Sequence, residues 1–365
     1  MGIEQAFRSK IAPEQGIQVG DKSGRRRAYF PVNDSGKGMQ NFTTEYEIMR
    51  PDLCRLLHDA AKDRVNYIFN NSVETFEETR NKVHVRFTDA RTEDYDLLVG
   101  ADGQYSHVRR LMIGLDKPDA LHSLKDLYVA YFTAPQEMAE KEGYMATLYL
   151  APGRRGIMTR RHNPHEIQVY LGCTTDSEKL KNARRGDVKK EKEALAEVLE
   201  GAGWRSKEIV EAMMTADDFY CERMGLVKMD SWSKGRVVLV GDAAYCPTAN
   251  TGMGTTCGMV GAYILAGEIG KHCGVSLQAD GTSQDNATDG LANALMAYDE
   301  KFRPFMDQVQ KGVAEGSSNY PSTAFTIGIL NGLLGLASFL KINLGKWMLK
   351  EDVKGWDLPD YAELR

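Results

Sequence analysis

Residues 235–268 read GRVVLVGDAAYCPTANTGMGTTCGMVGAYILAGE, and this stretch decides how the rest of the chain is interpreted. The run Arg236–Val240 holds four consecutive apolar residues, which predicts a strand buried on both faces. Gly241 permits a turn that presents Asp242, and glycines then lead into a helix expected from about Thr255 to His272. The free N–H groups and positive dipole end of such a helix favour negative charge. The stretch therefore predicts a site for an anionic or electron-accepting ligand. The alternative is an ordinary β–α connection, in which the glycines only satisfy the geometry of the turn.

A second stretch, GADGQYSHVR at residues 100–109, follows an apolar strand expected over residues 95–100. An Asp-Gly turn at Asp102 closes this strand, and Ser106 can cap the helix that carries Arg109. The carboxylate of Asp102 and the guanidinium of Arg109 can contact a ligand or be purely structural. The sequence leaves both interpretations open.

A third stretch, IMRPDLCRLL at residues 48–57, leads into a helix expected over Pro51–Lys62, where apolar residues recur at helical spacing. Arg50 stands immediately before this helix. Its planar guanidinium can donate two parallel hydrogen bonds, which suits a phosphate group. An ordinary surface charge is the alternative for this residue.

The remaining segments indicate the domain organisation, beginning with residues 1–27, which read as a helix end and a turn. Short runs typical of strands lie at residues 67–69, 82–87, 127–133, 146–150, 156–159 and 167–172, and a charged helical stretch follows at residues 178–200. We therefore expect a discontinuous first domain, residues 1–125 and 226–295, with a β-rich domain, residues 126–225, inserted into it. A C-terminal helical segment, residues 296–365, closes the chain.

Composition excludes several classes of protein. The 365 residues carry 46 basic and 51 acidic side chains, a formal net charge of −5, so we expect no general attraction to nucleic acid or anionic lipid. The six cysteines form no Cys-x-x-Cys pair, which favours free thiols of an intracellular protein. We interpret His162 and His165 as surface residues of a turn and predict no metal site. The first residues lack the pattern of a secretory signal, so we expect a cytoplasmic location.

Residues 324–340, AFTIGILNGLLGLASFL, form an apolar run of 17 residues, which is the lower limit for a membrane-spanning helix. Thr326, Asn331 and Ser338 dilute this run. A buried or peripheral helix is therefore favoured over an anchor. Contact of residues 324–345 with a membrane remains the alternative.

The three motifs, taken in this order, resemble those of the class A flavin-dependent monooxygenases, the p-hydroxybenzoate hydroxylase-like group. The tetracycline-inactivating and fungal secondary-metabolite branches are the most similar. The resemblance implies an α/β fold in which a Rossmann-like FAD-binding domain carries an inserted β-rich substrate domain and C-terminal helices. It also implies an FAD-dependent monooxygenase of secondary metabolism. Such an enzyme hydroxylates or epoxidises a small hydrophobic organic substrate, with O2 and with NADPH or NADH as reductant.

The resemblance also assigns cofactor-binding residues. Asp242 corresponds to the aspartate that bonds the ribityl chain of FAD, and Arg50 to the arginine at its phosphates. The loop and helix start that face the pyrimidine edge of the flavin correspond to Gly252, Met253, Gly254 and Thr255. Asp102 and Arg109 match the motif that supports the pyrophosphate region and the path of the nicotinamide cofactor. The sequence singles out no catalytic acid, base or nucleophile.

One expected feature is missing from this sequence. The family begins with a β-α-β unit that carries Gly-x-Gly-x-x-Gly, and no such pattern occurs in these 365 residues. Residues 2–7 resemble the segment that follows this unit, so we expect several dozen family residues to be absent. A misplaced start, a boundary of the given sequence and a true deletion each account for this absence. For a true deletion, the alternative function is a truncated, non-catalytic remnant of the family that no longer holds FAD.

Overall fold

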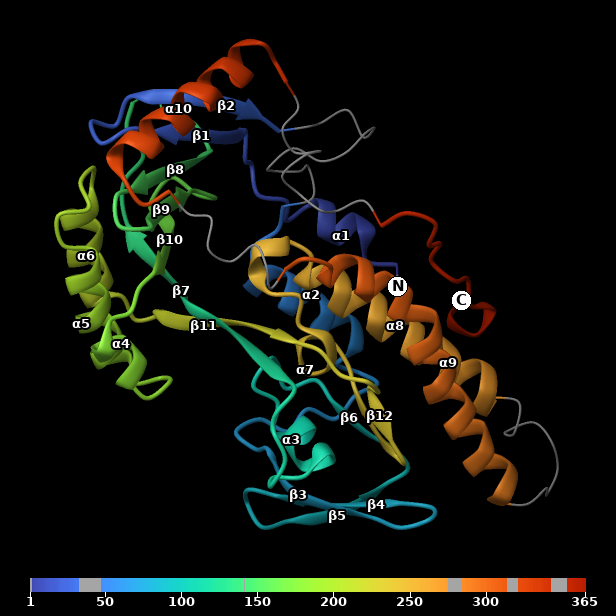
Figure 1. Cartoon of the computed structure of the whole chain (residues 1–365). Helices are drawn as coiled ribbons and strands as arrows, with labels where there is room; N and C mark the ends of the chain where they lie inside the picture. Colours follow the sequence, from blue (N-terminus) through green and yellow to red (C-terminus); the bar gives the residue numbers. More distant parts are fainter. Residues whose placement is uncertain (1, 33–46, 141, 275–283, 314–320, 343–352) are drawn as a thin grey trace. The chain divides into compact units, whose positions relative to one another are not determined.

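The computed structural model describes residues 2–32, 47–140, 142–274, 284–313, 321–342 and 353–365 (Figure 1). The chain forms two compact units. Unit 1 comprises Met1–Tyr67, Lys125–Met224 and Gly316–Leu349, and unit 2 comprises Ile68–Leu124, Gly225–Glu315 and Lys350–Arg365. Each unit is built from segments that lie far apart in the sequence.

Unit 1 is organised around a seven-stranded sheet in the order β11-β7-β10-β9-β8-β1-β2. The strands are β1 (Gly16–Gly20), β2 (Arg26–Pro31), β7 (Leu121–Pro135), β8 (Met145–Ala151), β9 (Arg155–Arg160), β10 (Glu166–Thr174) and β11 (Tyr220–Val227). The strands expected from residues 127 to 172 are all present; three are slightly longer than expected, and β7 extends well beyond residues 127–133 at its start. β8 with β9 and β9 with β10 pair antiparallel through short connections, and β10 also pairs antiparallel with the more distant β7, whereas β1 and β8 pair in parallel.

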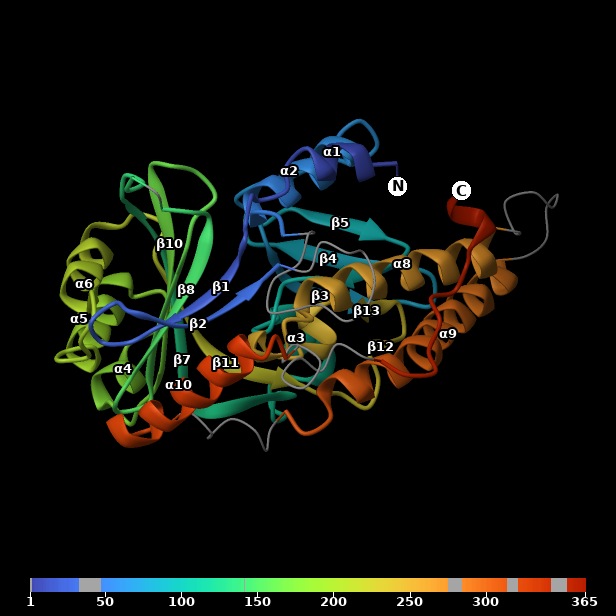
Figure 2. The same cartoon turned by 90° about the horizontal axis from the view of Figure 1, so that it is seen from above.

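One face of this sheet is covered by α4 (Glu178–Asn182), α5 (Val188–Val198) and α6 (Ser206–Thr215), as Figure 2 shows. Leu180, Leu195 and Ile209 pack there against inward residues of β7 and β10. The charged helical stretch is therefore two helices and not one. They are separated around Gly186, whose positive φ of 80° suits glycine and not a helix.

The prediction for residues 1–27 was incomplete. A short helix, α1 (Glu4–Arg8), is present, but residues 16–31 form the β1–β2 hairpin. Ile17 and Val19 are buried there with Ala146 of β8. This pairing joins the N-terminal segment to unit 1, because β1 is the parallel neighbour of β8.

Two further helices belong to unit 1. The expected helix after Arg50 is α2 (Arg50–Ala61), and the apolar run forms α10 (Ala324–Phe339). The end of α10 is fixed on β2, where the Ser338 hydroxyl donates to the carbonyl of Tyr29 at 2.7 Å. Among the described residues, no helix has both the length and the apolar character needed to cross a membrane.

Unit 2 contains two small three-stranded sheets and several helices. One sheet is the meander β3 (Val73–Glu78), β4 (Val83–Phe87) and β5 (Thr92–Tyr95), and the other has the order β12-β13-β6, from β6 (Leu98–Gly100), β12 (Ser233–Lys234) and β13 (Val237–Leu239). The helices are α3 (His107–Ile113), α7 (Asp242–Tyr245), α8 (Gly254–Cys273) and α9 (Gln284–Gln310). Residues 67–69, expected as a strand, lie outside any strand, and the meander begins at Val73. The buried core of this unit centres on β13, whose three residues are fully buried.

The two units differ from the domain boundaries predicted from the sequence. The strands from residues 127 to 172 and β13 do lie in separate sheets, as that division requires. However, residues 1–67 and 316–349 group with residues 125–224, because β1 pairs with β8 and α10 packs on β2. Which unit holds the cofactor and which the substrate remains a prediction.

Candidate functional site

The Asp-Gly turn of unit 2 is organised by the carboxylate of Asp102. This carboxylate accepts hydrogen bonds from the Ser106 hydroxyl at 2.5 Å, the His107 amide at 2.7 Å and the Val108 amide at 3.1 Å. Ser106 in turn caps α3, because its hydroxyl oxygen accepts from the amide of Arg109 at 2.9 Å. Asp102 thus fixes the start of α3, which is the structural role that the sequence had left open.

Arg109 is fully buried, and its guanidinium is bonded to protein groups on every side. Nε and Nη2 donate to the carboxylate of Asp119 at 2.8 and 2.9 Å, and Nη2 also donates to the carbonyl of Gln104 at 2.7 Å. Nη1 donates to the carbonyl of Ala243 at 2.9 Å. The pKa of Asp119 is lowered: burial works against this, but the bonds and charge of Arg109 outweigh it. Arg109 therefore joins the Asp-Gly turn to the turn that carries Asp242.

Asp242 stands at the carboxyl end of a parallel strand pair, β6 and β13. Gly241 makes the turn out of β13 with a φ of 65°, a conformation that glycine adopts without strain. Asp242 begins the short helix α7 and is exposed, whereas the next three residues are buried. Ligands bind at this edge in open α/β sheets, so the exposed carboxylate is placed where a ligand can reach it.

Buried aromatic residues pack against the turn that carries Asp242. The Tyr298 hydroxyl donates to the carbonyl of Leu239 at 3.1 Å and lies 3.1 Å from the Tyr245 hydroxyl, and both rings contact Trp232. The amide of Gln310 donates to the carbonyl of Tyr245 at 3.1 Å. Sequence reasoning missed these supports because residues of α9 meet the turn only in the folded chain.

The start of α8 forms an open cradle. Gly252 adopts the left-handed conformation with a φ of 70°, and no side chain caps the helix at Met253. Thr255 is exposed, and a Cβ atom added at Gly254 or Gly258 would meet no atom within 4 Å. The free N–H groups of a 20-residue helix therefore lie beside open space, which favours a ligand that carries negative charge.

The chemistry of these groups fits FAD. An exposed carboxylate can accept hydrogen bonds from the ribityl hydroxyls, and a glycine cradle at a helix N-terminus can take the electron-rich edge of a flavin ring. The cradle is free of Cβ atoms at the two glycines that a bulky ring would approach. Asp242, Gly252, Met253, Gly254 and Thr255 lie in unit 2, on the continuous segment from α7 to α8.

Arg50 belongs to unit 1, where it is exposed at the first position of α2. Its Nη1 donates to the Tyr220 hydroxyl at 2.8 Å, and its guanidinium lies 5.7 Å from the ring centre of Tyr131. The rings of Tyr131 and Tyr220 stack at 4.8 Å, and Tyr170 meets Tyr131 edge-on at 5.1 Å. Burial raises the pKa of Tyr131 and Tyr220, so both phenols remain neutral.

These three tyrosines occupy one face of the large sheet. Ala130 and Phe132, the neighbours of Tyr131, are buried with α5 and α6. Because side chains alternate along a strand, Tyr131 points to the opposite face. Tyr170 and Tyr220 lie on the strands that flank β7 and meet it there. The sequence did not single out this tyrosine face, since its members come from three separate strands.

Other candidate groups have ordinary explanations. His162 lies 3.6 Å from the carboxylate of Glu166, and His165 lies 3.0 Å from that of Glu137. In the part of the chain that the structure describes, no group of three or more His, Cys, Asp or Glu residues could hold a metal ion. All six cysteines are free, and burial raises the pKa of Cys257, beside the α8 cradle, to about 12. A thiol with that pKa is a poor nucleophile.

A parallel strand pair that ends in an exposed aspartate, followed by a glycine cradle at a helix start, is the arrangement expected of a flavin-binding protein of the α/β class. A family described as "FAD binding domain" matches residues 1–275, more than half of the chain. The chain belongs to this family, within the p-hydroxybenzoate hydroxylase-like class A monooxygenases. The predicted family and fold class are thereby confirmed.

The chain is similar to several characterised relatives over most of its length. It is 46% identical over 370 residues to the FAD-dependent monooxygenase asL4 of Sarocladium schorii, which covers 100% of this chain and 86% of that protein. It is 34% identical over 379 residues to the monooxygenase CTB7 of Cercospora beticola, which covers 99% of this chain and 85% of that protein.

Solved structures give the same result. The crystal structure of the tetracycline destructase Tet(51) has a TM-score of 0.72 and 26% identity, and it covers 99% of this chain and 84% of that one. Klebsiella pneumoniae HpxO, in complex with FAD and uric acid, shares the fold with a TM-score of 0.68 at 17% identity. With these relatives, the chain is an FAD-dependent monooxygenase, and none of the comparisons favours the alternative of a non-catalytic remnant.

Proposed function

We propose that this monooxygenase takes electrons from NADPH or NADH and transfers one atom of O2 to a small hydrophobic organic substrate, by hydroxylation or epoxidation. The substrate class that we propose is an aromatic, polyketide-like or terpenoid-like metabolite of a secondary pathway. The similarity to asL4 of Sarocladium schorii, at 46% identity over the whole chain, carries this proposal. We also propose a cytoplasmic location, which agrees with six free cysteines.

Residues of unit 2 are proposed to hold the flavin. When bound, FAD supplies the hydride acceptor and the centre at which O2 is activated. Asp242 accepts hydrogen bonds from ribityl hydroxyls, a role supported by its exposure at the end of β13. Gly252, Met253, Gly254 and Thr255 present the N-terminus of α8 to the electron-rich edge of the ring, where the helix dipole stabilises negative charge.

The other motif residues are proposed to act in two ways. Arg50 binds phosphate oxygens of FAD, since its guanidinium is exposed and keeps donors beyond the single bond to Tyr220. Asp102 and Arg109 are positioning residues, because their polar atoms are bonded to protein groups. Asp102 fixes the start of α3, and Arg109 on that helix bonds the carbonyl of Ala243. Both residues therefore act on FAD by holding the Asp242 turn in place.

The tyrosine face of unit 1 is proposed to contact the substrate. Tyr131, Tyr170 and Tyr220 offer ring surfaces for stacking and hydroxyl groups for orientation. Burial raises the pKa of Tyr131 and Tyr220, and these neutral phenols suit an uncharged or weakly acidic aromatic substrate. No side chain here is suited to act as a nucleophile, so we assign no catalytic residue and leave the oxygen transfer to the cofactor.

The test uses the purified full chain incubated with FAD. The flavin retained after desalting is measured by absorbance, and oxidation of NADPH and of NADH is followed with a panel of phenolic, polyketide-like and terpenoid-like substrates. We expect retained FAD and a product that carries one oxygen atom from isotopically labelled O2. A well-folded chain that retains no FAD would instead establish the non-catalytic remnant. Product labelled from water would refute oxygen transfer from O2.

A further inference from the structure

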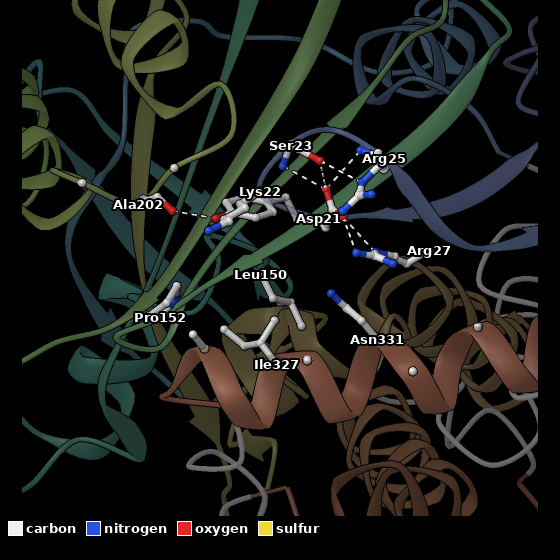
Figure 3. Close-up of a pocket in the computed structure, with 17 residues that line it drawn as sticks. Asp21, Lys22, Ser23, Arg25, Arg27, Leu150, Pro152, Ala202, Ile327 and Asn331 are labelled. Carbon is white, nitrogen blue, oxygen red and sulfur yellow. Dashed lines mark hydrogen bonds and ion pairs between the residues drawn. The ribbon is translucent and has the colours of Figure 1, made fainter.

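Unit 1 contains a cavity that is lined by none of the residues proposed above to contact the flavin or the substrate. Its volume is about 800 Å³, which falls in the range of small-molecule pockets. The turn between β1 and β2 forms one wall and α10 forms the other, as Figure 3 shows. The end of β8 and the loop before α6 complete the enclosure. None of the predicted flavin-binding residues lines this cavity.

Hydrogen bonds hold in place the strand and the helix that enclose the cavity. Tyr149 of β8 donates from its hydroxyl to the carbonyl of Ala202 at 2.6 Å, which ties the strand to the loop before α6. The amide of Gly153 donates to the carbonyl of Ser322 at 2.8 Å, just before α10 begins. At the other end of the helix, Ser338 is bonded to the backbone of Tyr29. Because both ends of α10 are held, the space beneath it is a fixed feature of unit 1.

Three cations, Lys22, Arg25 and Arg27, lie along the rim, opposed by a single acid, Asp21. The Asp21 carboxylate accepts from the Ser23 hydroxyl at 2.6 Å and from Arg27 Nε at 2.8 Å, and Arg25 lies 3.3 Å from it. The hydrogen bond from the Ser23 hydroxyl is the main cause that lowers the pKa of Asp21, so this acid stays ionised and bonded to its neighbours. In the part of the chain described by the structure, no hydrogen bond or ion pair engages the Lys22 ammonium. The rim therefore keeps an excess of positive charge.

The surface of the cavity on the side of α10 and the end of β8 is apolar and carries a groove. Leu150, Pro152 and Ile327 contribute its aliphatic surface. A Cβ atom at Gly328 or Gly332 of α10 would meet nothing within 4 Å, so the glycines leave a groove along the helix. This groove can hold an extended or flat apolar group.

One polar atom in the cavity lacks a partner. The Oδ1 atom of Asn331 is buried and accepts no hydrogen bond within the described chain, and in Figure 3 the side chain points from α10 toward the basic turn with its amide nitrogen at the tip. An unsatisfied buried acceptor is costly, so it favours a ligand that donates a hydrogen bond at this point. The cavity thus presents cations, an amide whose oxygen lacks a partner and an apolar groove to one occupant.

We propose that this cavity binds an amphipathic organic acid. The acidic group pairs with Lys22 and the adjacent arginines, the apolar body lies in the glycine groove of α10, and a hydroxyl near the acidic group hydrogen-bonds the amide of Asn331. The occupant is a single small molecule that enters from solution. The same chemistry occurs in the headgroup and chain of an anionic lipid in a bilayer, and the experiment below separates the two sources.

The experiment measures binding of decanoate, 3-hydroxydecanoate and 1-decanol to the full chain by isothermal titration calorimetry. We expect saturable binding of decanoate, tighter binding of 3-hydroxydecanoate, and binding of the uncharged alcohol weaker by at least about tenfold, because a charge-assisted hydrogen bond is lost. Lys22→Gln should weaken decanoate by about tenfold and leave 1-decanol unchanged. Asn331→Leu should remove the advantage of the hydroxy acid.

Gly332→Leu fills the groove and should abolish binding, while circular dichroism stays unchanged because leucine is the better helix former. Leu333→Ala is the matched control, since Leu333 lies next to Gly332 on α10 but points to solvent, with 60% of it exposed. Decanoate binding that survives Gly332→Leu would overturn the proposal. So would the absence of saturable binding together with sedimentation of the chain on phosphatidylglycerol vesicles, which would assign the same chemistry to a lipid surface.

Discussion

Arg109 donates from Nη1 to the carbonyl oxygen of Ala243 at 2.9 Å, across 134 residues of sequence. This bond links the helix after the Asp-Gly turn to the helix that begins with Asp242. The guanidinium is fully buried, and its remaining donors are bonded to Asp119 and Gln104. Two of the three sequence motifs are therefore parts of one hydrogen-bonded structure.

Replacement of this arginine should destabilise unit 2. Arg109→Gln leaves the carboxylate of Asp119 and the carbonyl of Ala243 without their partner, so we expect the free energy of unfolding to fall by about 3–5 kcal/mol. Urea denaturation followed by circular dichroism measures this change. Arg110→Gln is the control, because Arg110 is exposed on the same helix. A loss in Arg109→Gln no larger than in the control would contradict the assigned role.

Removal of the Asp242 charge should weaken flavin binding without a comparable loss of stability. Asp242→Asn keeps the size of an exposed side chain and loses acceptors for the ribityl hydroxyls, so we expect FAD affinity to fall by about tenfold or more. Flavin fluorescence titration measures the affinity. Asp230→Asn, at another exposed acid of unit 2, should leave it unchanged. Equal FAD affinities in the two variants would show that Asp242 does not contact the cofactor.

A side chain added to the glycine cradle should leave stability unchanged or raise it, but should prevent FAD binding. Gly254→Leu adds a side chain where a Cβ meets no atom within 4 Å, so the fold should tolerate it, with a gain of up to about 1 kcal/mol in helix propensity. The same side chain would occupy the space proposed for the flavin ring, and FAD retention should be lost. Gly274→Ala, at the other end of α8 and equally open, should retain FAD. Retention of FAD by Gly254→Leu would place the ring elsewhere.

A buried acid gives unit 2 a predictable response to low pH. Glu268 of α8 accepts from Lys301 Nζ at 2.5 Å and from the Tyr361 hydroxyl, and His272 lies 3.4 Å from its second oxygen. Burial alone would raise the pKa of Glu268, but the bonds from Lys301 and Tyr361 and the nearby charge of Lys271 hold it below the ordinary 4.5.

Because the folded-state pKa is the lower one, Glu268 stabilises the fold above pH 4.5, and this contribution disappears as the pH falls through the folded-state value. We expect unfolding free energies measured between pH 7 and pH 3 to decline more steeply in the natural chain than in Glu268→Gln. Glu300→Gln, at a solvent-exposed acid of α9, should keep the natural slope. If the unfolding free energies of the natural chain and of Glu268→Gln fell in parallel with pH, Glu268 would be excluded as the source of the acid sensitivity.

The strand and helix of residues 235–268 could be predicted from the sequence because their signals are local. Four apolar residues in a row specify β13, and small residues at a helix start specify α8. The β1–β2 hairpin could not be predicted, because Gly16–Gly20 becomes a buried strand only through its partner β8, which lies far along the chain. The role of Arg109 was equally hidden, since Ala243 comes close only in the folded protein. The tyrosine face depends in the same way on three strands that meet in one sheet.

The parallel pairing of β6 with β13 has a consequence for how the protein is made. Val237–Leu239 cannot pair with Leu98–Gly100 until the intervening chain, which includes five strands of the large sheet, has been synthesised and has left the ribosome. Closing so long a loop is entropically expensive and slow. The Asp242 turn, which depends on this pairing, should therefore be among the last parts of the enzyme to form. A nascent chain stalled before β13 would have a largely formed large sheet but neither the β6–β13 pair nor the Asp242 turn.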